Sequence, residues 1–154
     1  MSTMTEQATQ VYALFIRATP EQVWDAITKP EFTTKYFHGT RIQSTFEPGA
    51  PYLSVAGDGD RTLVDGEILE SDPPRVLKHT WRALYDPDTA AEPHSRVTWE
   101  IEPQEGGVTK LTVTHDQLEA APKTAMSVAG GWSHVLSGLK TLLETGEPLS
   151  TESM

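Results

Sequence analysis

The sequence of 154 residues contains no cysteine. This absence excludes disulfides, thiolate nucleophiles and zinc sites built on cysteine. Long apolar stretches are missing too, because no run approaches the ~18 residues that a membrane-spanning helix needs. The N-terminus Met1–Gln7 also lacks the apolar core of a signal peptide. We therefore predict a cytoplasmic protein that does not interact with a membrane.

Basic residues are scarce: 12 lysines and arginines stand against 22 aspartates and glutamates, which gives a formal net charge of −10. This charge repels phosphate backbones, so we expect no nucleic-acid partner. Its simplest role is solubility. The hydrophobic content of 37% and the charged content of 22% are those of an ordinary globular protein. A chain of this length suits one domain that buries about 70% of its unfolded surface.

Helix signals stand near the N-terminus. Thr19 can cap a helix whose first position is a proline, and Gln22 follows three residues after the cap, as a capping box requires. Pro30 ends this helix and begins a second short one that reaches Tyr36 or Phe37. The sequence therefore predicts two short helices in succession.

A second helix signal lies near the C-terminus. Gly130, Gly131 and Trp132 open a long amphipathic stretch that ends at Gly146, a natural C-cap. The apolar stripe consists of Val128, Trp132, Val135, Leu136, Leu139, Leu142 and Leu143. We interpret the glycine pair as permitting a kink or a close approach of helix to sheet.

Between the helices, apolar and polar residues alternate as in strands with one buried face. The expected strands are Val11–Ile16, Thr40–Phe46, Tyr52–Ala56, Leu63–Leu69, Val76–Arg82, Arg96–Glu102 and Lys110–His115. Tyr85–Pro93 is expected to be a polar loop. This order predicts an α+β fold, in which a curved antiparallel sheet of about seven strands wraps around the long C-terminal helix. We expect one domain over residues 9–149, with flexible termini at 1–8 and 150–154.

The alternation directs aromatic and imidazole side chains toward the concave side of the sheet. The predicted ligand-binding residues are Tyr36, Phe37, His79, Trp81, Trp99, Val113, His115, Val128, Trp132 and Leu136. Core packing is the default explanation for the tryptophans. A buried imidazole without a partner costs about 1–3 kcal/mol, so His79 and His115 need either a neighbouring polar group or a ligand. The sequence leaves both readings open.

Signals for other chemistry are weak. His38, His79, His94, His115 and His134 show no metal-binding spacing. The acidic segment at residues 57–60 lacks the remaining positions of a calcium loop, so a hairpin turn is expected there. We therefore assign no metal, no cofactor and no catalytic residue.

Four segments in order resemble a known family: Ala18–Ala26, Gly66–Arg75 leading to Trp81, Leu111–Asp116, and Gly131–Trp132 with Leu139–Leu149. They resemble the START-like (SRPBCC) superfamily, whose helix-grip fold also occurs in birch-pollen allergens. Within it, the chain is similar to single-domain members of the family named after the activator of the heat-shock ATPase. The resemblance runs from about residue 10 to residue 149. It implies a cavity between the sheet and the long helix for apolar or amphipathic molecules.

We accordingly expect a protein that binds a small hydrophobic ligand, such as a lipid, a polyketide-like compound or an aromatic compound. One alternative is a cyclase, dehydratase or hydrolase in which His79 or His115 moves protons, although the predicted inner faces carry no Asp or Glu to orient them. Enzymatic activity is left undecided, with binding preferred.

The other alternative is a co-chaperone or stress-response interaction protein. The co-chaperones of this family carry an additional N-terminal domain, for which this chain has no room, so a chaperone partner is not expected. Some family members are encoded beside metal- or stress-responsive repressors. Val11–Ile16 is apolar on both alternating faces, which leaves open whether a helix covers one face or a homodimer contact forms there.

Overall fold

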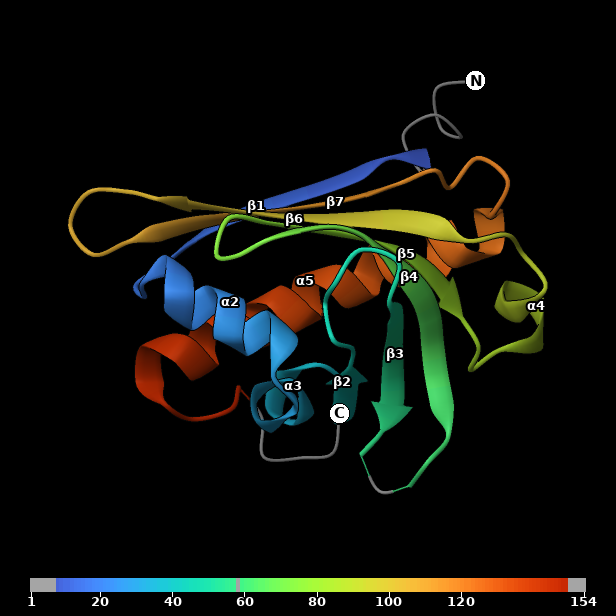
Figure 1. Cartoon of the computed structure of the whole chain (residues 1–154), viewed down its shortest axis with the longest axis horizontal. Coiled ribbons are helices and arrows are strands. Elements are labelled where there is room, and N and C mark those ends of the chain that lie inside the picture. The colour runs from blue at the N-terminus through green and yellow to red at the C-terminus, as the bar shows by residue number, and fades with distance from the viewer. Residues whose placement is uncertain (1–7, 58, 150–154) are drawn as a thin grey trace.

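The computed structural model describes residues 8–57 and 59–149. The strands are β1 (Gln10–Ile16), β2 (Thr40–Gln43), β3 (Pro51–Ala56), β4 (Thr62–Asp72), β5 (Val76–Ala83), β6 (Ser95–Pro103) and β7 (Thr109–Asp116). The helices are α2 (Pro20–Thr28), α3 (Pro30–Tyr36), α4 (Pro87–Ala90) and α5 (Pro122–Thr145). One antiparallel seven-stranded sheet, in the order β1-β7-β6-β5-β4-β3-β2, curls around α5, while α2 and α3 lie beside that helix (Figure 1). The predicted α+β helix-grip fold is confirmed.

The helix α5 lies across the concave face of the sheet and carries the apolar stripe into the core. It begins at Pro122 rather than at the glycine pair, so the predicted start is wrong. Proline suits the first helical turn, and the packing of Ala125 and Val128 in the buried face offsets the ~1 kcal/mol that each interior glycine costs. The predicted C-cap is confirmed, since Gly146 has a φ of 81° and its N–H donates to the Leu142 carbonyl at 2.8 Å.

The glycine pair does not mediate a close approach. A Cβ atom added at Gly130 or Gly131 would meet no heavy atom within 4 Å. Close contact occurs instead at Gly138, where an added Cβ would lie 3.2 Å from the Cβ of Tyr36. The helix therefore approaches α3 at Gly138, whereas Gly131 faces open space.

The two short helices form as the sequence predicts. The Gln22 N–H donates to the Thr19 hydroxyl at 3.1 Å, and the Thr19 N–H donates to the Gln22 side-chain oxygen at 2.8 Å, which completes the capping box. Pro30 begins α3, and Tyr36 ends it with its hydroxyl bonded to the Ala26 carbonyl at 2.7 Å. This bond ties the two helices together at the edge of the core.

Several strand boundaries differ from those predicted. The expected strand Thr40–Phe46 ends at Gln43, because Phe46 has a φ of 61° and its N–H turns back to the Ser44 hydroxyl at 2.9 Å. The strand β4 continues past Leu69 to Asp72. The loop Tyr85–Pro93 contains the short helix α4. In each case a local hydrogen bond or a longer pairing overrides the alternation pattern.

Two irregularities accompany the curvature of the sheet. The register shifts between Ser54 and Val55 in the β3–β4 pair and between Ile68 and Glu70 in the β4–β5 pair. Such bulges bend the bulged strand and increase its twist. Gly66 allows a close approach near the second shift, since an added Cβ would lie 2.0 Å from the Thr80 carbonyl oxygen. The sheet can thus curl far enough to enclose α5.

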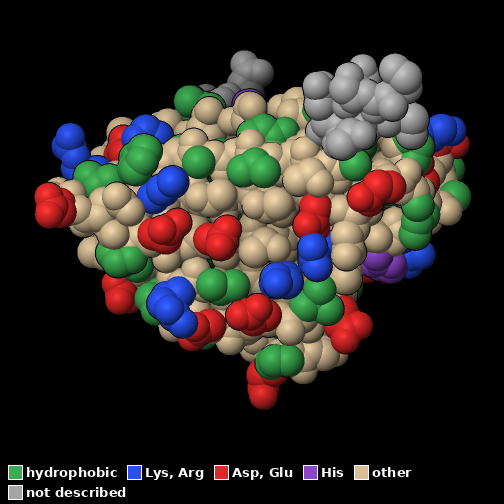
Figure 2. All heavy atoms as spheres, turned by 90° about the horizontal axis from the view of Figure 1, so that it is seen from above, with side chains coloured by type: hydrophobic (Ala, Val, Ile, Leu, Met, Phe, Trp, Pro, Cys, Tyr) green, Lys and Arg blue, Asp and Glu red, His purple; other side chains and the backbone are tan. Residues whose placement is uncertain are grey.

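The edge strand β1 has one covered face and one open face. Ile16 is buried in the core that contacts α5, whereas Val11 and Phe15 are 60% and 53% exposed on the other face. The Lys110 ammonium lies 5.9 Å from the centre of the Phe15 ring. Figure 2 shows the molecule from above the view of Figure 1, and on this face acidic and basic side chains are interspersed with hydrophobic ones. One face of Val11–Ile16 is therefore covered by α5, which is one of the two alternatives that the sequence leaves open for this strand.

The boundaries of the domain, at residues 9 and 149, remain a prediction. Ala8 is buried and accepts a hydrogen bond from the Leu118 N–H at 3.3 Å. The remainder of the predicted flexible termini, residues 1–7 and 150–154, lies outside the described residues. The turn expected at residues 57–60 joins the antiparallel pair β3 and β4, and residue 58 within it is likewise not described.

Candidate functional site

A cavity of about 470 Å³ lies between the curved sheet and α5. Its wall combines the end of α3, the strands β2 to β5, the loop after β5 and one face of α5. The lining residues are Phe37, His38, Thr40, Ser54, Leu63, Val64, Trp81, Tyr85, Ser127, Val128, Gly131, Trp132 and Val135. This volume is typical of small-molecule sites, which are mainly apolar with a few polar groups.

Only part of the predicted site reaches this wall. Phe37, Trp81, Val128 and Trp132 line the cavity. The other predicted residues are buried in the packed core and are absent from the wall: Tyr36, His79, Trp99, Val113, His115 and Leu136. The alternation of the strands identifies which side chains face inward, but it does not separate those that pack together from those that border a space.

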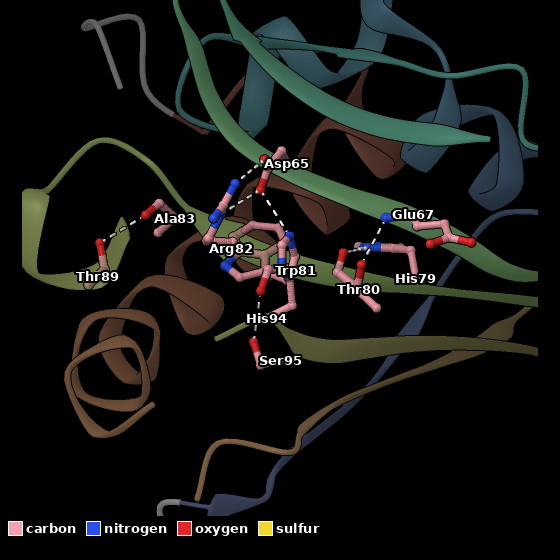
Figure 3. Close-up of polar contacts among 10 residues, drawn as sticks. All are labelled: Asp65, Glu67, His79, Thr80, Trp81, Arg82, Ala83, Thr89, His94 and Ser95. Atoms are coloured by element: carbon pink, nitrogen blue, oxygen red, sulfur yellow. Dashed lines mark hydrogen bonds and ion pairs between the residues drawn. The ribbon is translucent and has the colours of Figure 1, made fainter. Parts of the chain in front are cut away.

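His79 is held by hydrogen bonds on both ring nitrogens. Its Nε2 accepts the indole N–H of Trp99 at 3.0 Å, and its Nδ1 lies 2.9 Å from the Thr80 carbonyl oxygen. The carbonyl can only accept, so Nδ1 carries the proton (Figure 3). The ring also stacks on Tyr52 with centroids 3.7 Å apart. Burial lowers the pKa of His79 to about 4, so the imidazole is neutral at neutral pH.

His115 has the opposite tautomer. Its Nδ1 accepts the indole N–H of Trp132 at 3.0 Å, and its Nε2 lies 2.7 Å from the Ser95 hydroxyl. The hydroxyl donates in turn to the Trp81 carbonyl at 3.2 Å, so Nε2–H donates to Ser95. Burial, and then the nearby His79, lower the pKa of His115 to about 3. Both imidazoles are thus buried, and each ring nitrogen has a hydrogen-bond partner within the protein.

Strand register explains why these side chains meet. His79 and His115 both pair with Val97 of β6, the strand between β5 and β7, one from each side. Trp99 and Ser95 lie two residues on either side of Val97, so each is a diagonal neighbour of both histidines; Trp99 bonds to His79 and Ser95 to His115. Diagonal neighbours across a sheet come within reach when their side chains are long. We refer to His79, Trp99, Ser95, His115 and Trp132 as the histidine–tryptophan network.

Trp81 lies beside this network without a comparable bond. Its indole nitrogen is one of two buried side-chain nitrogens that lack a hydrogen-bond partner in the described part of the chain; the other is Nε of Arg41. The Trp81 ring contacts Phe37 and Trp132, with centroids 6.2 and 5.9 Å away, and meets the His115 ring edge-on at 5.8 Å. A buried donor without a partner costs about 1–3 kcal/mol.

The polar groups at the cavity belong to residues that the sequence pattern did not assign to the site. The Tyr85 hydroxyl lies 2.8 Å from that of Ser127, which joins the loop after β5 to α5. Ser54 is buried on β3. The ring of His38 stacks on that of His134 at 6.2 Å, and burial followed by His134 lowers the pKa of His38.

The signals for these residues were weak for different reasons. Ser54 falls within an expected strand, but its small polar side chain gave no reason to select it. Leu63 and Val64 likewise lie in an expected strand, and both faces at that point are apolar. Tyr85 lies in a loop and Ser127 before the expected helix start, so no periodicity could place either of them at a cavity.

Charged side chains lie away from the cavity. The wall contains no Asp, Glu, Lys or Arg among the described residues. Arg82 pairs with Asp65 through bonds of 3.1 and 2.7 Å, and the His94 ring lies 3.1 Å from the same carboxylate (Figure 3). The hydrogen bond from Arg82 is the main cause that lowers the pKa of Asp65. Within residues 8–57 and 59–149, no group of three or more His, Asp or Glu side chains is placed to hold a metal ion.

Comparison with protein families supplies an independent result. The family described as "Activator of Hsp90 ATPase homolog 1-like protein" matches residues 17–144. No curated protein matches the chain. Across the described residues, no helix combines the length and apolarity needed to cross a membrane.

Solved structures share the fold. DynU16, from the dynemicin biosynthetic locus, has a TM-score of 0.74 at 24% identity, over 92% of this chain and 49% of its own. An Hsp90 activator from Plasmodium falciparum has a TM-score of 0.72 at 20% identity, over 88% of this chain and 96% of its own. The Aha1 dimer from Colwellia psychrerythraea has a TM-score of 0.70 at 17% identity, over 90% of this chain and 97% of its own. At these identities the likeness establishes the fold alone.

Proposed function

The chain belongs to the family of Activator of Hsp90 ATPase homolog 1-like proteins, and we propose that it binds a small hydrophobic or amphipathic molecule in the cavity between the sheet and α5. The observation that carries this proposal is the cavity of about 470 Å³ with an uncharged, largely apolar wall. The cavity opens to solvent, since Tyr85 and Ser127 on its wall are exposed, and its apolar surface can be removed from water by a ligand.

Burial of apolar surface supplies the affinity. Each Å² removed from water contributes about 25 cal/mol, so a ligand that buries roughly 200 Å² of apolar surface gains ~5 kcal/mol before the costs of ordering. The aromatic rings of Phe37, Trp81 and Trp132 offer flat surfaces to such a ligand. The hydroxyls of Ser54, Tyr85 and Ser127 add polar groups to the wall, which suits an amphipathic molecule.

The geometry favours binding over catalysis by histidine. Both nitrogens of His79 and of His115 are engaged in hydrogen bonds within the core, and neither residue lines the cavity. Their lowered pKa values of about 4 and about 3 also make them poor proton acceptors near neutral pH. A cyclase, dehydratase or hydrolase that relies on these imidazoles is therefore less well supported.

Two neighbouring glycines of α5 allow a matched test. Gly131 lines the cavity and Gly130 is exposed, and a Cβ at either position meets no heavy atom within 4 Å. We expect Gly131→Leu to occupy part of the cavity and to weaken binding of the neutral dye N-phenyl-1-naphthylamine by about tenfold or more. Gly130→Leu should leave the affinity unchanged. The measurement is a fluorescence titration of each purified protein.

Two results would count against the proposal. Equal dye affinity in both variants and in the wild-type protein would place the binding site elsewhere. Failure of the wild-type protein to bind the dye, or any compound in a native mass-spectrometry screen of lipophilic molecules, would contradict binding in the cavity altogether.

A further inference from the structure

Two hydroxyl groups meet at the open side of the cavity. The hydroxyl of Tyr85, from the loop after β5, lies 2.8 Å from that of Ser127 on α5, and the bond between them is exposed to solvent. Both residues line the cavity, and both are exposed, Tyr85 at 42%. We refer to Tyr85 and Ser127 as the hydroxyl pair. A molecule that enters the cavity from solvent can reach this pair directly.

The loop that carries Tyr85 is held on α5 by other contacts. The Glu92 carboxylate accepts the backbone N–H groups of Lys123 and Thr124, at 3.0 and 2.8 Å, at the start of the helix. The Lys123 ammonium also lies 3.5 Å from the carboxylate of Asp88. Because these contacts already attach the loop to the helix, the exposed bond of the hydroxyl pair adds little further stability, since its members exchange it for bonds to water.

The hydroxyl pair has hydrogen-bonding capacity left over. Each hydroxyl can donate one hydrogen and accept two. The bond between Tyr85 and Ser127 uses one hydrogen and one acceptor site, and neither side chain makes a second bond within the described part of the chain. An alcohol matches what remains, because its oxygen can accept the free hydrogen while its own hydrogen goes to the other oxygen of the pair. This arrangement closes a ring of three hydrogen bonds that strengthen one another.

The rest of the wall indicates how such a ligand lies. Along α5 the wall runs from Ser127 through Val128, Gly131 and Trp132 to Val135, which is roughly 12 Å at the rise of ~1.5 Å per residue. Ser127 is exposed, whereas Val128, Trp132 and Val135 are buried. Apolar surface therefore extends inward from the hydroxyl pair, and a ligand bound at the pair by its polar end directs its apolar body along this surface.

We propose that the hydroxyl pair binds the hydroxyl end group of an alcohol whose apolar body lies against Trp81 and Trp132. This inference rests on the proposed function and specifies the polar group and the orientation of its ligand. A neutral end group suits the wall, because no lysine or arginine is found among its described residues and a charged group without a partner is costly to desolvate. The wall hydroxyl of Thr40 is already engaged, since it donates to the Phe37 carbonyl at 2.7 Å.

Two probes isolate the end group. The compounds 2-naphthaleneethanol and 2-propylnaphthalene differ only in a terminal hydroxyl or methyl group, and displacement of N-phenyl-1-naphthylamine measures the affinity of each. Tyr85→Phe and Ser127→Ala each remove one member of the hydroxyl pair at an exposed position. Each variant should bind the alcohol about fivefold more weakly, which corresponds to about 1 kcal/mol, and the hydrocarbon as tightly as the wild-type protein does.

A control variant and a second readout accompany the affinities. Ser133 is exposed on α5 and does not line the cavity, so Ser133→Ala should leave both affinities unchanged. In the wild-type protein, nuclear Overhauser effects should connect the CH2 group beside the alcohol hydroxyl to the Tyr85 ring, and the naphthalene protons to the Trp132 ring. A purely structural role of the hydroxyl pair predicts neither this orientation nor a difference between the two probes.

The outcomes separate the two proposals. If Tyr85→Phe and Ser127→Ala weaken both probes equally or weaken neither, or if the bound alcohol lies in the reverse orientation, the role of the hydroxyl pair is overturned while binding in the cavity stands. The same conclusion follows if the dye and the hydrocarbon bind the wild-type protein and the alcohol does not. If none of the three compounds binds, the proposed function falls and the role of the hydroxyl pair with it.

Discussion

The histidine–tryptophan network and the cavity wall are adjacent and are built from the same kinds of residue, yet they differ in how their polar groups are used. In the network, each imidazole nitrogen and each indole N–H has a partner within the protein. The wall borders a cavity of about 470 Å³, and one of its residues, Trp81, has a buried indole nitrogen without a hydrogen-bond partner among the described residues. The comparison indicates that inward-facing aromatic and polar residues can either pack together with all their hydrogen bonds made, as in the network, or border an open space, as in the wall.

Acid should destabilise the network most strongly. The pKa values of His79 and His115 are lowered to about 4 and about 3, so the unfolded chain binds more protons than the folded one from about pH 6.5 down to about pH 4 for His79 and about pH 3 for His115. The two neutral imidazoles therefore contribute fully to the free energy of unfolding above pH 6.5, and this contribution is lost as the pH falls through this window. The pKa shift of His79 alone corresponds to a loss of roughly 3 kcal/mol of unfolding free energy. Urea denaturation at a series of pH values measures the loss.

A control variant identifies the histidines responsible. His94 is on the surface, where its ring helps Arg82 to lower the pKa of Asp65, so His94→Gln should alter the pH dependence much less than His79→Gln does. His79→Gln should show a smaller slope of stability against pH, because one of the two buried imidazoles is gone. A wild-type stability that does not change between pH 6.5 and pH 4.5 would contradict the neutral, satisfied state of both rings.

The same substitution in the two regions should have unequal costs. Trp99→Phe removes the donor to His79 and leaves a buried imidazole nitrogen unpaired, whereas Trp81→Phe removes no bond within the protein. Loss of ring volume is common to both variants. We therefore expect Trp99→Phe to destabilise the protein by about 1–3 kcal/mol more than Trp81→Phe, measured by urea denaturation without ligand. Equal costs would mean that the Trp99–His79 bond contributes nothing net.

Substitutions at the two glycines should have the smallest effect on stability. Gly130→Leu and Gly131→Leu each replace a poor helix former within α5 and meet open space, so each should raise the free energy of unfolding by about 0.5–1 kcal/mol. Thermal unfolding without ligand measures this gain. A clear destabilisation by Gly131→Leu alone would show that the wall has no room for a side chain, and hence that the cavity is filled in solution.

Much of the architecture was predictable from local signals. The capping box at Thr19, the C-cap at Gly146 and the alternation of the later strands each depend on neighbouring residues only, and each is confirmed. The order of these elements together with the family motifs predicted the helix-grip fold. The errors came where a distant contact or a turn decides the outcome, as at Phe46 and at the start of α5.

The candidate site was predictable only in part. Phe37, Trp81, Val128 and Trp132 were selected and do line the cavity, but the selected His79 and His115 are bonded within the core. An inward-facing strand position has the same sequence signature whether it meets a neighbour or a void. Tyr85 and Ser127 reach the wall because a loop and a helix face each other across it, a proximity that no periodicity records.

By itself, the sequence determined the order of the helices and strands, the caps at Thr19 and Gly146, and which strand side chains face inward, since these depend on backbone preferences and on periodicity over a few residues. The tertiary structure alone decided how the inward side chains share their hydrogen bonds and where the space among them remains open. That division depends on strand register and on the distance at which α5 crosses the sheet. Both arise from contacts between residues far apart in the chain, such as the 3.0 Å bond between Trp132 and His115.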